Sequence, residues 1–410
     1  MFNTAEIKKD FPMLQGITMN GKPLVYLDNG ATTFKPQPVI DAVNYFYNNI
    51  NSNIHRGDYE IAFKADQAYD HCRKTVAEFI NCDEREVVFT YGATSALNTV
   101  AYGYARKNLK EGDVILLTRA EHASNALPWF RVAEETGAKI EYIELTPTGK
   151  MTLWNLRKAI HEGVRIVAIA AVTNVLGVKT PVREICRMAH KVGAVVRVDG
   201  AQSVPHTRTD VKDMDCDFLA FSGHKMCGPG GTGILYGKYE LLEKMDPMLL
   251  GGGANARFDS KQNVILKEAP IMFEAGTPNI EGVLGLDAAI QYLMKLGMDN
   301  IESHEQELRD YLFAELAKLD NVTVYNPDGD SAIAAINVKG VFSQDAACYL
   351  ASQGVAVRSG NHCAKMLVDV IGTNDTIRCS MYFYNDKADV DALIRALRTC
   401  TLENCVGVFF

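Results

Sequence analysis

The sequence predicts an α/β protein in which a large domain built on a mostly parallel sheet is followed by a smaller α+β domain. Apolar runs of strand length alternate with helical patterns between residues 87 and 236. Such alternation favours βαβ units, with helices on both faces of the sheet. The chain has 410 residues, 47% of them hydrophobic and 22% charged, which is enough apolar material for two or three globular domains.

The strands of the large sheet are predicted from apolar runs bounded by glycine or polar residues. They are Val87–Thr90, Val114–Leu117, Lys139–Ile143, Arg165–Val172, Ala194–Val198 and Phe218–Phe221, followed by Ile234–Tyr236 as an antiparallel edge strand. An apolar stripe at helical spacing runs from Asp58, the expected N-cap, to Ile80. Residues 249–258, LLGGGANARF, are expected to form a flexible glycine-rich loop.

The chain is predicted to divide into three parts. Residues 1–20, with a short amphipathic helix, pack with the small domain; residues 21–298 form the large domain, which ends in a long apolar helix from 280; and residues 299–410 form the small domain. The small domain is expected to contain helices at 302–319 and 343–353, and strands at 322–325, 333–338 and around Val355 and Ile377.

Charge, hydropathy and cysteine usage exclude several classes of function. A formal net charge of −8 without a basic tract argues against nucleic acid as the main partner. No apolar run approaches the length of a membrane span, and the N-terminus lacks the apolar core of a secretory signal. The ten cysteines include no C-x-x-C pair, so neither a zinc ribbon nor a disulfide framework is expected, and a reducing cytoplasm fits best.

Two of the predicted strands deliver a charged residue at their C-terminal ends, where open α/β sheets place their chemistry. One ends in Asp199, and the other runs into S-G-H-K, which ends at Lys225. This pair suits pyridoxal 5'-phosphate (PLP), because Lys225 can form a Schiff base with its aldehyde and Asp199 can keep its pyridine nitrogen protonated. Taken singly, each residue has an ordinary alternative, as a solvated loop lysine or a turn-capping aspartate.

Small and hydroxyl-bearing residues near these strand ends can hold the rest of PLP. The strand at 87–90 turns into a helix that begins with Ala93 and Thr94, whose free N–H groups and hydroxyl form a site for a phosphate dianion. Ser222 and His224 flank the lysine with groups that can bind phosphate oxygens. Gln202 can reach the phenolic oxygen of the ring.

His122 follows another strand end. Its imidazole can stack on the pyridine ring and move a proton near neutral pH, although a lone histidine at a strand end is more often structural.

The small domain carries a second chemical pattern, AVRSGNHCA at 356–364. Cys363 lies in a loop after a strand, so its thiol can be exposed, whereas most cysteines are small buried hydrophobes. The His362-Cys363 pair suggests metal ligation, but no second pair stands at ligand spacing and no metal is expected. A nucleophilic thiolate, favoured by an adjacent imidazole or a cationic neighbourhood, fits better. Arg378, fifteen residues on, can bind an amino-acid carboxylate with two parallel hydrogen bonds, or form a surface salt bridge.

These motifs together resemble the class V aminotransferase-like PLP enzymes of fold type I. The resemblance rests on D-G-A-Q at 199–202, S-G-H-K at 222–225 and G-P-x-G-x-G at 228–233. R-S-G-N-H-C-A at 358–364 is similar to the R-x-G-x-H-C-A motif of group II, or SUF-type, cysteine desulfurases, the branch that includes selenocysteine lyase-like enzymes. Their H-R-G motif matches residues 55–57. The resemblance implies a seven-stranded, mostly parallel sheet in a PLP-binding large domain.

The same resemblance implies that L-cysteine is converted to L-alanine, and that the sulfur passes to Cys363 as a persulfide. A SufE-like or SufU-like acceptor would then take it for iron–sulfur cluster assembly. The implied catalytic residues are Lys225, Cys363 and a ring-stacking His122, and the implied substrate-binding residues are Arg378, Asn174, Arg358 and His55. Asn174 also donates to the phenolic oxygen of PLP, and Thr277 reaches the phosphate of the neighbouring subunit, which implies a homodimer with shared active sites.

Two alternatives stay open. The first is another PLP enzyme on the same fold, such as a selenocysteine lyase, a cysteine-sulfinate lyase or an aminotransferase, although Cys363 argues against the last. The second is a sulfur-carrier scaffold that depends on an acceptor protein. The sequence also departs from the usual SUF-type pattern at Ala93, Ser95, Ala96 and Met366.

Overall fold

A computed structural model describes residues 2–55 and 57–408 of the chain. Arg56, part of the H-R-G motif, and the terminal residues 1, 409 and 410 lie outside the described residues. Among the helices described, none has the length and apolar character needed to cross a membrane.

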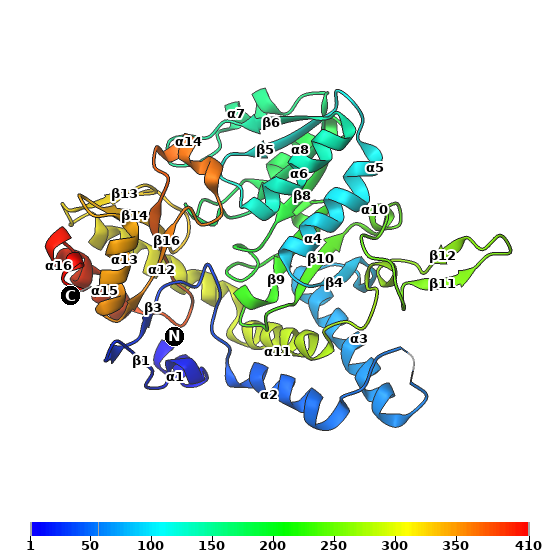
Figure 1. Cartoon of the computed structure of the whole chain (residues 1–410), viewed down its shortest axis with the longest axis horizontal. Helices are drawn as coiled ribbons and strands as arrows, with labels where there is room; N and C mark the ends of the chain where they lie inside the picture. Colours follow the sequence, from blue (N-terminus) through cyan, green and yellow to red (C-terminus); the bar gives the residue numbers. More distant parts are fainter. Residues whose placement is uncertain (1, 56, 409–410) are drawn as a thin grey trace.

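The large sheet has seven strands, as expected. They are β4 (Val87–Thr90), β5 (Val114–Thr118), β6 (Lys139–Ile143), β7 (Val164–Ala170), β8 (Val195–Asp199), β9 (Phe218–Ser222) and β10 (Gly233–Gly237). Their order across the sheet is β4-β10-β9-β8-β7-β5-β6 (Figure 1). Strand β10 runs antiparallel to β4 and β9, and the other adjacent pairs are parallel. The chain order reverses between β5 and β7, which opens a crevice at the C-terminal ends of the strands.

One detail of this prediction was wrong. The strand that contains Ile234–Tyr236 is antiparallel but does not lie at the edge, because β4 pairs with its free side. All five residues of β10 are buried, as a strand covered on both faces requires.

Helices cover both faces of this sheet. Alternate residues of β5 show the division, since Val114 and Leu116 join one apolar core while Ile115 and Leu117 join another. The first core includes residues of α3 (Glu60–Ile80), α8 (Val182–Lys191) and α11 (Ile280–Leu296). The second face is covered by α4 (Ala93–Val100) and α6 (Ala123–Thr136).

Smaller helices complete this part of the chain. They are α2 (Gln37–Tyr45), α5 (Arg106–Asn108), α7 (Leu153–Ala159), α9 (Val211–Met214) and α10 (Tyr239–Leu242).

Helix α3 begins two residues after the expected N-cap Asp58, and the residue at its N-cap, Tyr59, makes no capping hydrogen bond.

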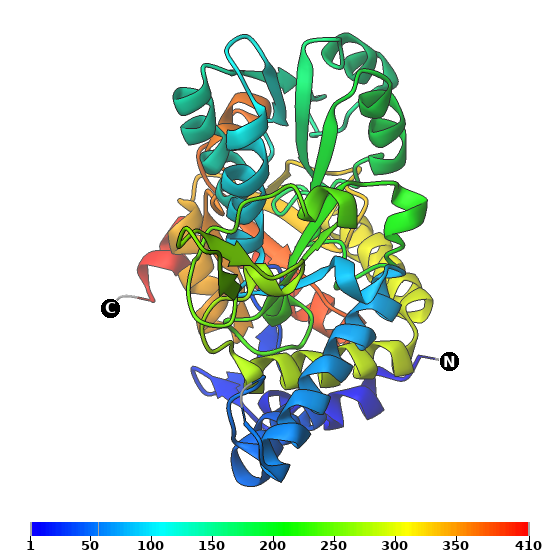
Figure 2. The same cartoon turned by 90° about the vertical axis from the view of Figure 1, so that its right-hand side faces the viewer.

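The segment predicted as a flexible glycine-rich loop contains a strand. Strand β11 (Asn255–Phe258) pairs with β12 (Val264–Leu266) in an antiparallel hairpin. The hairpin projects from the body of the molecule in Figure 1 and points towards the viewer in Figure 2. Phe258 and Val264 on this hairpin are exposed. The glycines at 251–253 precede the strand instead of interrupting it, which is why their flexibility does not extend to it.

A second, four-stranded antiparallel sheet follows near the C-terminal end. Its order is β13 (Val322–Val324), β14 (Ile333–Val338), β17 (Thr376–Ser380) and β16 (Arg358–Gly360). The accompanying helices are α12 (Met298–Leu316), α13 (Ser343–Ser352), α14 (Val368–Ile371), α15 (Lys387–Arg398) and α16 (Leu402–Val406). The predicted domain boundaries at 20 and 298 stay predictions.

The N-terminal residues lie against this second part of the chain. Helix α1 (Thr4–Lys9) carries Lys8, whose amine lies 2.6 Å from Asp386. The two-stranded sheet of β1 (Thr18–Met19) and β2 (Lys22–Pro23) follows, and β3 (Val25–Tyr26) then pairs in parallel with β15 (Val355–Ala356). This pairing brings the residues after β3 to the edge of the large-sheet crevice.

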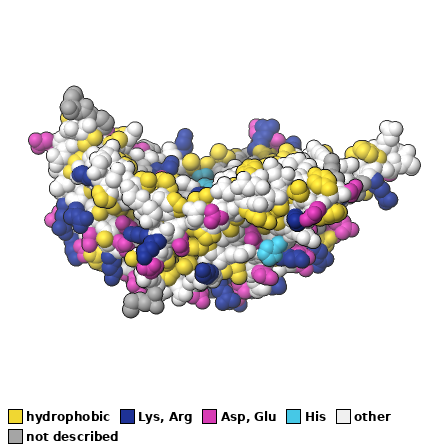
Figure 3. Space-filling view, turned by 90° about the horizontal axis from the view of Figure 1, so that it is seen from below, with side chains coloured by type: hydrophobic (Ala, Val, Ile, Leu, Met, Phe, Trp, Pro, Cys, Tyr) yellow, Lys and Arg dark blue, Asp and Glu magenta, His cyan; other side chains and the backbone are white. Residues whose placement is uncertain are grey.

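The face formed by α2 and α3 carries apolar side chains among charged ones. Figure 3 looks at the molecule from that side and shows yellow hydrophobic groups along its length. Tyr45 at the end of α2, and Ile61 and Phe63 near the start of α3, are among the exposed large side chains there.

Candidate active site

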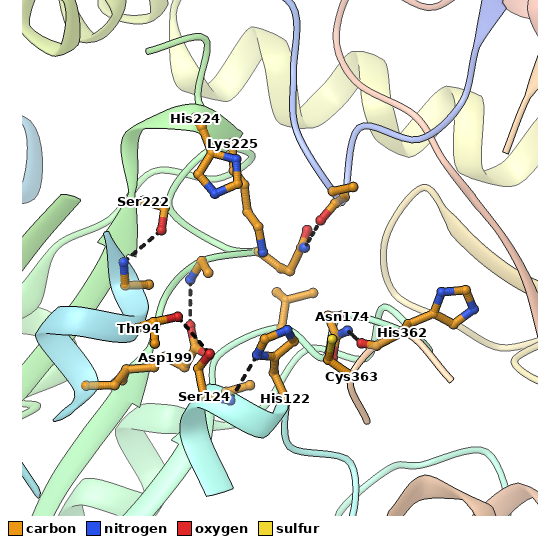
Figure 4. Close-up of a pocket in the computed structure, with 18 of the residues that line it drawn as sticks. Thr94, His122, Ser124, Asn174, Asp199, Ser222, His224, Lys225, His362 and Cys363 are labelled. Atoms are coloured by element: carbon orange, nitrogen blue, oxygen red, sulfur yellow. Dashed lines mark hydrogen bonds between the residues drawn. The ribbon is translucent and has the colours of Figure 1, made fainter. Parts of the chain in front are cut away.

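A cavity of about 300 Å³ lies at the C-terminal ends of β5, β7, β8 and β9, with the loop after β16 on its other side. Figure 4 shows how its side chains converge from the two sheets. Every predicted site residue except His55 and Thr277 lines this cavity: Ala93, Thr94, His122, Asn174, Asp199, Gln202, Ser222, His224, Lys225, Arg358, Cys363 and Arg378.

Lys225 enters the cavity from the short turn that follows β9. Residues 223–225 form one turn of 3₁₀ helix, and a side chain at Gly223 would collide with the hydroxyl of Thr232. Burial of the Lys225 amine lowers its pKa to about 8, while the negative charge of Asp199 opposes that shift. A lysine in this environment has an appreciable neutral fraction near neutral pH.

Asp199 is the last residue of β8 and is buried. Its Oδ1 accepts a hydrogen bond from the backbone N–H of Ala201 at 2.9 Å, which fixes the carboxylate at the strand end. Gln202, one turn further on, donates to the carbonyl oxygen of Gly30 at 2.7 Å. The N-terminal segment therefore closes over this side of the cavity.

The N-terminus of α4 forms one end of the cavity. Gly92 precedes it with a φ of 140°, and a side chain at Gly233 would collide with Gly92, so both glycines allow the turn to pack tightly against β10. The backbone N–H of Ala93 donates to the hydroxyl of Ser222 at 2.8 Å, and the hydroxyls of Thr94 and Ser124 lie 2.7 Å apart. These donors converge on the place where the sequence predicts a phosphate.

His122 caps the other helix that begins at this edge, α6. Its Nδ1 accepts a hydrogen bond from the N–H of Ser124 at 3.1 Å, so the proton of the neutral ring is on Nε2. Burial and the nearby Lys225 lower its pKa, so the ring is neutral at pH 7. The same two causes lower the pKa of His224 to about 4.

A buried polar cluster behind His122 and Asp199 was missed by sequence reasoning. Glu121 accepts hydrogen bonds from Thr118 at 2.6 Å and from the Asn125 amide at 2.5 Å, and burial raises its pKa to about 7. Arg197 donates to the Asn125 side chain, and its guanidinium lies 4.6 Å from the centre of the Trp129 ring. Arg197 is two residues before Asp199 on β8, and the strand period of two was the signal that placed both side chains on one face.

Cys363 lies in the loop after β16 and is exposed. Both His362 and Cys363 have left-handed backbone conformations, with φ of 50° and 59°, which non-glycine residues adopt at a cost. The loop is held by two hydrogen bonds to the opposite wall: the Ala123 N–H donates to the Cys363 carbonyl at 2.7 Å, and the Asn174 amide donates to the His362 carbonyl at 2.8 Å.

The imidazole of His362, next to Cys363 in the sequence, makes its hydrogen bonds to Thr376 and not to the Cys363 thiol. His362 is buried, and its ring points away from Cys363 (Figure 4). Its Nε2 lies 3.0 Å from both the carbonyl and the hydroxyl oxygens of Thr376. Burial lowers its pKa to about 4, so it is neutral. The cationic neighbours of Cys363 are instead Lys225 and Arg358, the latter at the start of the strand that leads into the loop.

Arg378 on β17 is buried at the cavity wall, and one side of its guanidinium donates to the Asn174 carbonyl at 3.1 Å. The other side donates to Asp28 at 3.2 Å. A side chain on Gly30 would lie 3.2 Å from the Arg378 guanidinium carbon, so glycine leaves room for it. Asp28 was not among the predicted site residues, because its arginine partners follow it by more than 300 positions in the sequence.

His55 and Thr277 lie elsewhere. They line a separate cavity of about 150 Å³, together with Gly252, Lys267 and Glu274. The segment that carries Thr277 is anchored by Glu274, which forms a buried pair with Arg73 at 2.8 Å. Within one described chain, these two residues and Lys225 do not share a cavity.

The fold and the Lys225 cavity define a class of protein, and comparison with known proteins names it. Residues 25–393 match the family model described as aminotransferase class-V, and the chain belongs to that family. Lys225 follows β9 and Asp199 ends β8, so both fall within the matched residues.

Individual relatives narrow the class further, to cysteine desulfurases. The chain is 46% identical, over 96% of its own length and 97% of the relative's, to a probable cysteine desulfurase of Halalkalibacterium halodurans. Its structure is similar to an apo cysteine desulfurase of Thermococcus onnurineus, with a TM-score of 0.91, 36% identity and coverage of 96% and 97% of the two chains. It is also similar to the Escherichia coli cysteine desulfurase CsdA, with a TM-score of 0.89, 37% identity and 99% coverage of each chain.

These findings confirm the family and fold class expected from the sequence, with cysteine desulfurases as the chain's relatives. They also support the prediction that the protein is an enzyme of that kind. The roles of individual site residues stay predictions.

Proposed function

We propose that the protein is a PLP-dependent cysteine desulfurase that converts L-cysteine to L-alanine and takes the sulfur onto Cys363. One observation carries the proposal: a lysine amine with a depressed pKa and an exposed cysteine thiol line the same cavity. The first suits covalent attachment of an aldehyde cofactor, and the second suits a nucleophile that must hand its product on.

The residues around Lys225 fit PLP. Within the described residues, the buried Asn174 Oδ1 has no hydrogen-bond partner, and the N-terminus of α4 meets the hydroxyl of Ser222 at a site suited to a phosphate. Lys225 would hold the aldehyde end, Asp199 the ring nitrogen and His122 the ring face, while Ala93, Thr94, Ser222 and His224 would hold the phosphate. When bound, the ring supplies an electron sink for the negative charge that develops at the α-carbon of the substrate.

Side chains of the cavity would bind the substrate and transfer its protons. Arg378 and Asn174 would hold the α-carboxylate of L-cysteine, since a guanidinium binds a carboxylate through parallel hydrogen bonds. Lys225, whose amine is neutral in part near neutral pH, would take the α-proton. His122, neutral with its proton on Nε2, would exchange a proton with the substrate thiol.

Sulfur transfer to Cys363 balances without an added oxidant. The thiolate of Cys363 attacks the substrate sulfur, the carbon–sulfur bond breaks as a sulfur–sulfur bond forms, and the carbon that loses sulfur gains a proton. L-Cysteine and one thiol become L-alanine and one persulfide. The guanidinium of Arg358 lies close enough to Cys363 for the two groups to interact electrostatically.

We also propose an oligomeric state, a sulfur acceptor and a pathway for this enzyme. A homodimer with shared active sites is supported by the separate position of His55 and Thr277, and by the exposed apolar side chains of α2 and α3. The exposure of Cys363 supports transfer to an acceptor protein of the SufE-like or SufU-like kind, in a cytoplasmic SUF pathway of iron–sulfur cluster assembly. A reducing compartment would keep that thiol free.

The test is an absorbance spectrum of the purified protein before and after L-cysteine, with alanine and sulfide measured in the same tube. A band at about 420 nm, typical of PLP bound to a lysine, should change as alanine and sulfide accumulate. A band without alanine production would contradict the desulfurase proposal and indicate another substrate. Persulfide formation that stops after one turnover with small thiols, and resumes only with an acceptor protein, would indicate the sulfur-carrier alternative.

A further inference from the structure

The carbonyl oxygen of His224 belongs to the peptide unit that leads directly into Lys225, whose side chain extends from it towards the centre of the cavity (Figure 4). In the turn at residues 223–225, the carbonyl of Gly223 accepts hydrogen bonds from the N–H groups of Met226 and Gly228 at 3.0 and 2.9 Å. Those bonds stay within the turn and the loop after it. The next carbonyl, that of His224, lies where a short helix cannot satisfy its own acceptors, so its partners have to come from elsewhere.

Residues 32–35 of the N-terminal segment supply these partners. The N–H of Thr33 donates to the His224 carbonyl at 3.0 Å, and the hydroxyls of Thr32 and Thr33 donate to it at 3.1 and 3.2 Å. The Thr33 hydroxyl also accepts a hydrogen bond from the N–H of Cys227 at 2.8 Å. The segment is therefore bonded to the chain on both sides of Lys225.

Lys35 brings a charged group to the same contact. Its amine lies 3.4 Å from both the His224 carbonyl oxygen and the Thr32 hydroxyl, and it also donates to the Thr33 carbonyl. Within the described chain these oxygens are its hydrogen-bond partners, and none of them belongs to a carboxylate. The residue is partly buried, and burial lowers the pKa of its amine. A partly buried lysine without a counter-ion is costly to keep, which points to a role at the turn that it contacts.

We propose that Lys35 is a positioning residue for the Lys225 amine: together with Thr32 it holds the His224 carbonyl, and so fixes the peptide unit from which the Lys225 side chain enters the cavity. This inference rests on the proposed function, in which Lys225 bonds to PLP. Lys35 is not among the described residues that line the cavity, so it acts through the peptide unit and not on the cofactor.

Orientation matters for the reaction between Lys225 and PLP. The amine adds to the aldehyde carbon, and water leaves as the carbon–nitrogen double bond forms. A small misplacement of one reacting group slows such a step steeply, even when the other contacts are intact. The proposed phosphate site, where Ala93 meets Ser222, has no hydrogen bond to Lys35 among the described residues. Loss of Lys35 should therefore slow covalent attachment without weakening the non-covalent binding of the cofactor.

The test compares Lys35→Met with wild type as apoprotein, using two probes. PLP can bond to Lys225, whereas pyridoxamine 5'-phosphate carries an amine in place of the aldehyde and binds only non-covalently. The rate of PLP attachment, followed at about 420 nm and by mass spectrometry after borohydride reduction, should fall on the order of tenfold in the variant, as for loss of one charged hydrogen bond. The dissociation constant of pyridoxamine 5'-phosphate, from titration calorimetry, should change by less than about twofold, as for a substitution that does not touch the ligand.

Three further variants serve as controls. Lys35→Arg keeps the charge and the donors, and should recover most of the rate. Thr32→Val removes an uncharged hydroxyl from the same carbonyl and should slow attachment about threefold, so it decides the question if Lys35→Met does not fold. Lys238→Met removes another partly buried lysine, which pairs with Asp215 and Asp217 at the opposite edge of the sheet, and should leave the rate unchanged.

The pH dependence of attachment separates positioning from a direct effect of charge. The charges that act on the Lys225 amine are those of Asp199, Arg378 and Cys363, so the midpoint should be the same in Lys35→Met as in wild type. A shifted midpoint would mean that Lys35 acts by its charge and would overturn the proposal. Attachment as fast as in wild type, or weakening of pyridoxamine 5'-phosphate binding by the same factor as the rate, would overturn it too.

The same measurements distinguish failure of this inference from failure of the proposed function. If wild-type apoprotein bound pyridoxamine 5'-phosphate but formed no absorbance band with PLP, the proposed function would fail, and this inference with it. A normal band in wild type with unchanged attachment in Lys35→Met would overturn the role of Lys35 alone.

Discussion

The two walls of the active-site cavity are built differently. The wall from the seven-stranded sheet presents Asp199 and Ser222 at buried strand ends, each fixed by a hydrogen bond to backbone N–H. The facing wall is a loop in which Cys363 is exposed and two successive residues have left-handed conformations. The comparison teaches that the groups expected to hold the cofactor are pre-positioned, whereas the group expected to receive sulfur is accessible and strained.

The largest effect is expected from breaking the sheet wall at Lys225. In Lys225→Ala, the absorbance band of the bound cofactor should be lost, and desulfurase activity should fall at least on the order of 100-fold, since the amine is also the proposed acid–base group. Absorbance spectra and alanine assays of the purified variant check both. Activity retained with the band absent would show that the sheet wall is not the cofactor site.

A substitution in the loop wall should reduce activity without affecting cofactor binding at the sheet wall. In Cys363→Ala, alanine formation from cysteine should fall on the order of 100-fold, as expected for loss of a single catalytic group, while the cofactor band stays as in wild type. The same protein should lose persulfide, measured by alkylation and mass spectrometry. Full turnover in this variant would assign sulfur acceptance to another group.

Removing a hydrogen bond that joins the two walls should reduce activity by an intermediate amount. Asn174→Ala removes the 2.8 Å hydrogen bond from the side chain to the His362 carbonyl. A buried carbonyl left unpaired costs about 1 to 3 kcal/mol, so the loop should loosen and kcat/KM for cysteine should fall about tenfold. Hydrogen exchange in residues 360–365 should quicken in the variant, and unchanged exchange would mean that the loop is held by other contacts.

The smallest expected effect is on the pH dependence of cofactor incorporation, which reports the pKa of Lys225. Its amine must be neutral to bond to the cofactor, and its pKa lies at about 8 instead of the ordinary 10.5. Cofactor incorporation by apoprotein should therefore quicken as pH rises towards about 8 and then level off. Because Asp199 raises this pKa, Asp199→Asn should move the midpoint to lower pH.

The same shift has a defined sign for stability. Between about pH 8 and 10.5 the unfolded protein binds more protons at this lysine than the folded protein, so its contribution to the free energy of unfolding rises with pH. If the rate of cofactor incorporation continued to rise up to pH 10.5, the pKa of Lys225 would be that of an ordinary lysine, which would contradict this prediction.

Most of the sheet wall could be predicted from the sequence, because each of its groups follows an apolar run directly. Asp199, Lys225, His122 and the start of α4 are all set by local patterns at strand ends. The position of β10 was mispredicted, because strand order depends on long-range pairing that an apolar run does not encode.

The loop wall was only partly predictable. The sequence indicated the exposed Cys363, yet it offered the neighbouring imidazole as a candidate to activate the thiol, and the structure turns His362 to Thr376 instead. Asp28 shows the general reason. Its carboxylate binds Arg358 and Arg378, and no local pattern reports a contact across such a separation.

That long separation bears on how the protein is made. Asp28, Asn29 and Gly30 are hydrogen-bonded to residues 378–380, so the cavity joins two segments that lie far apart in the sequence. A ribosome delivers the first segment long before the second, and parts of a chain generally fold as they emerge. The Lys225 amine can thus be in place while the arginines and Cys363 are still unmade. Under the proposed roles of Cys363 and Arg378, a nascent chain is therefore unable to start sulfur chemistry before residue 378 has been made.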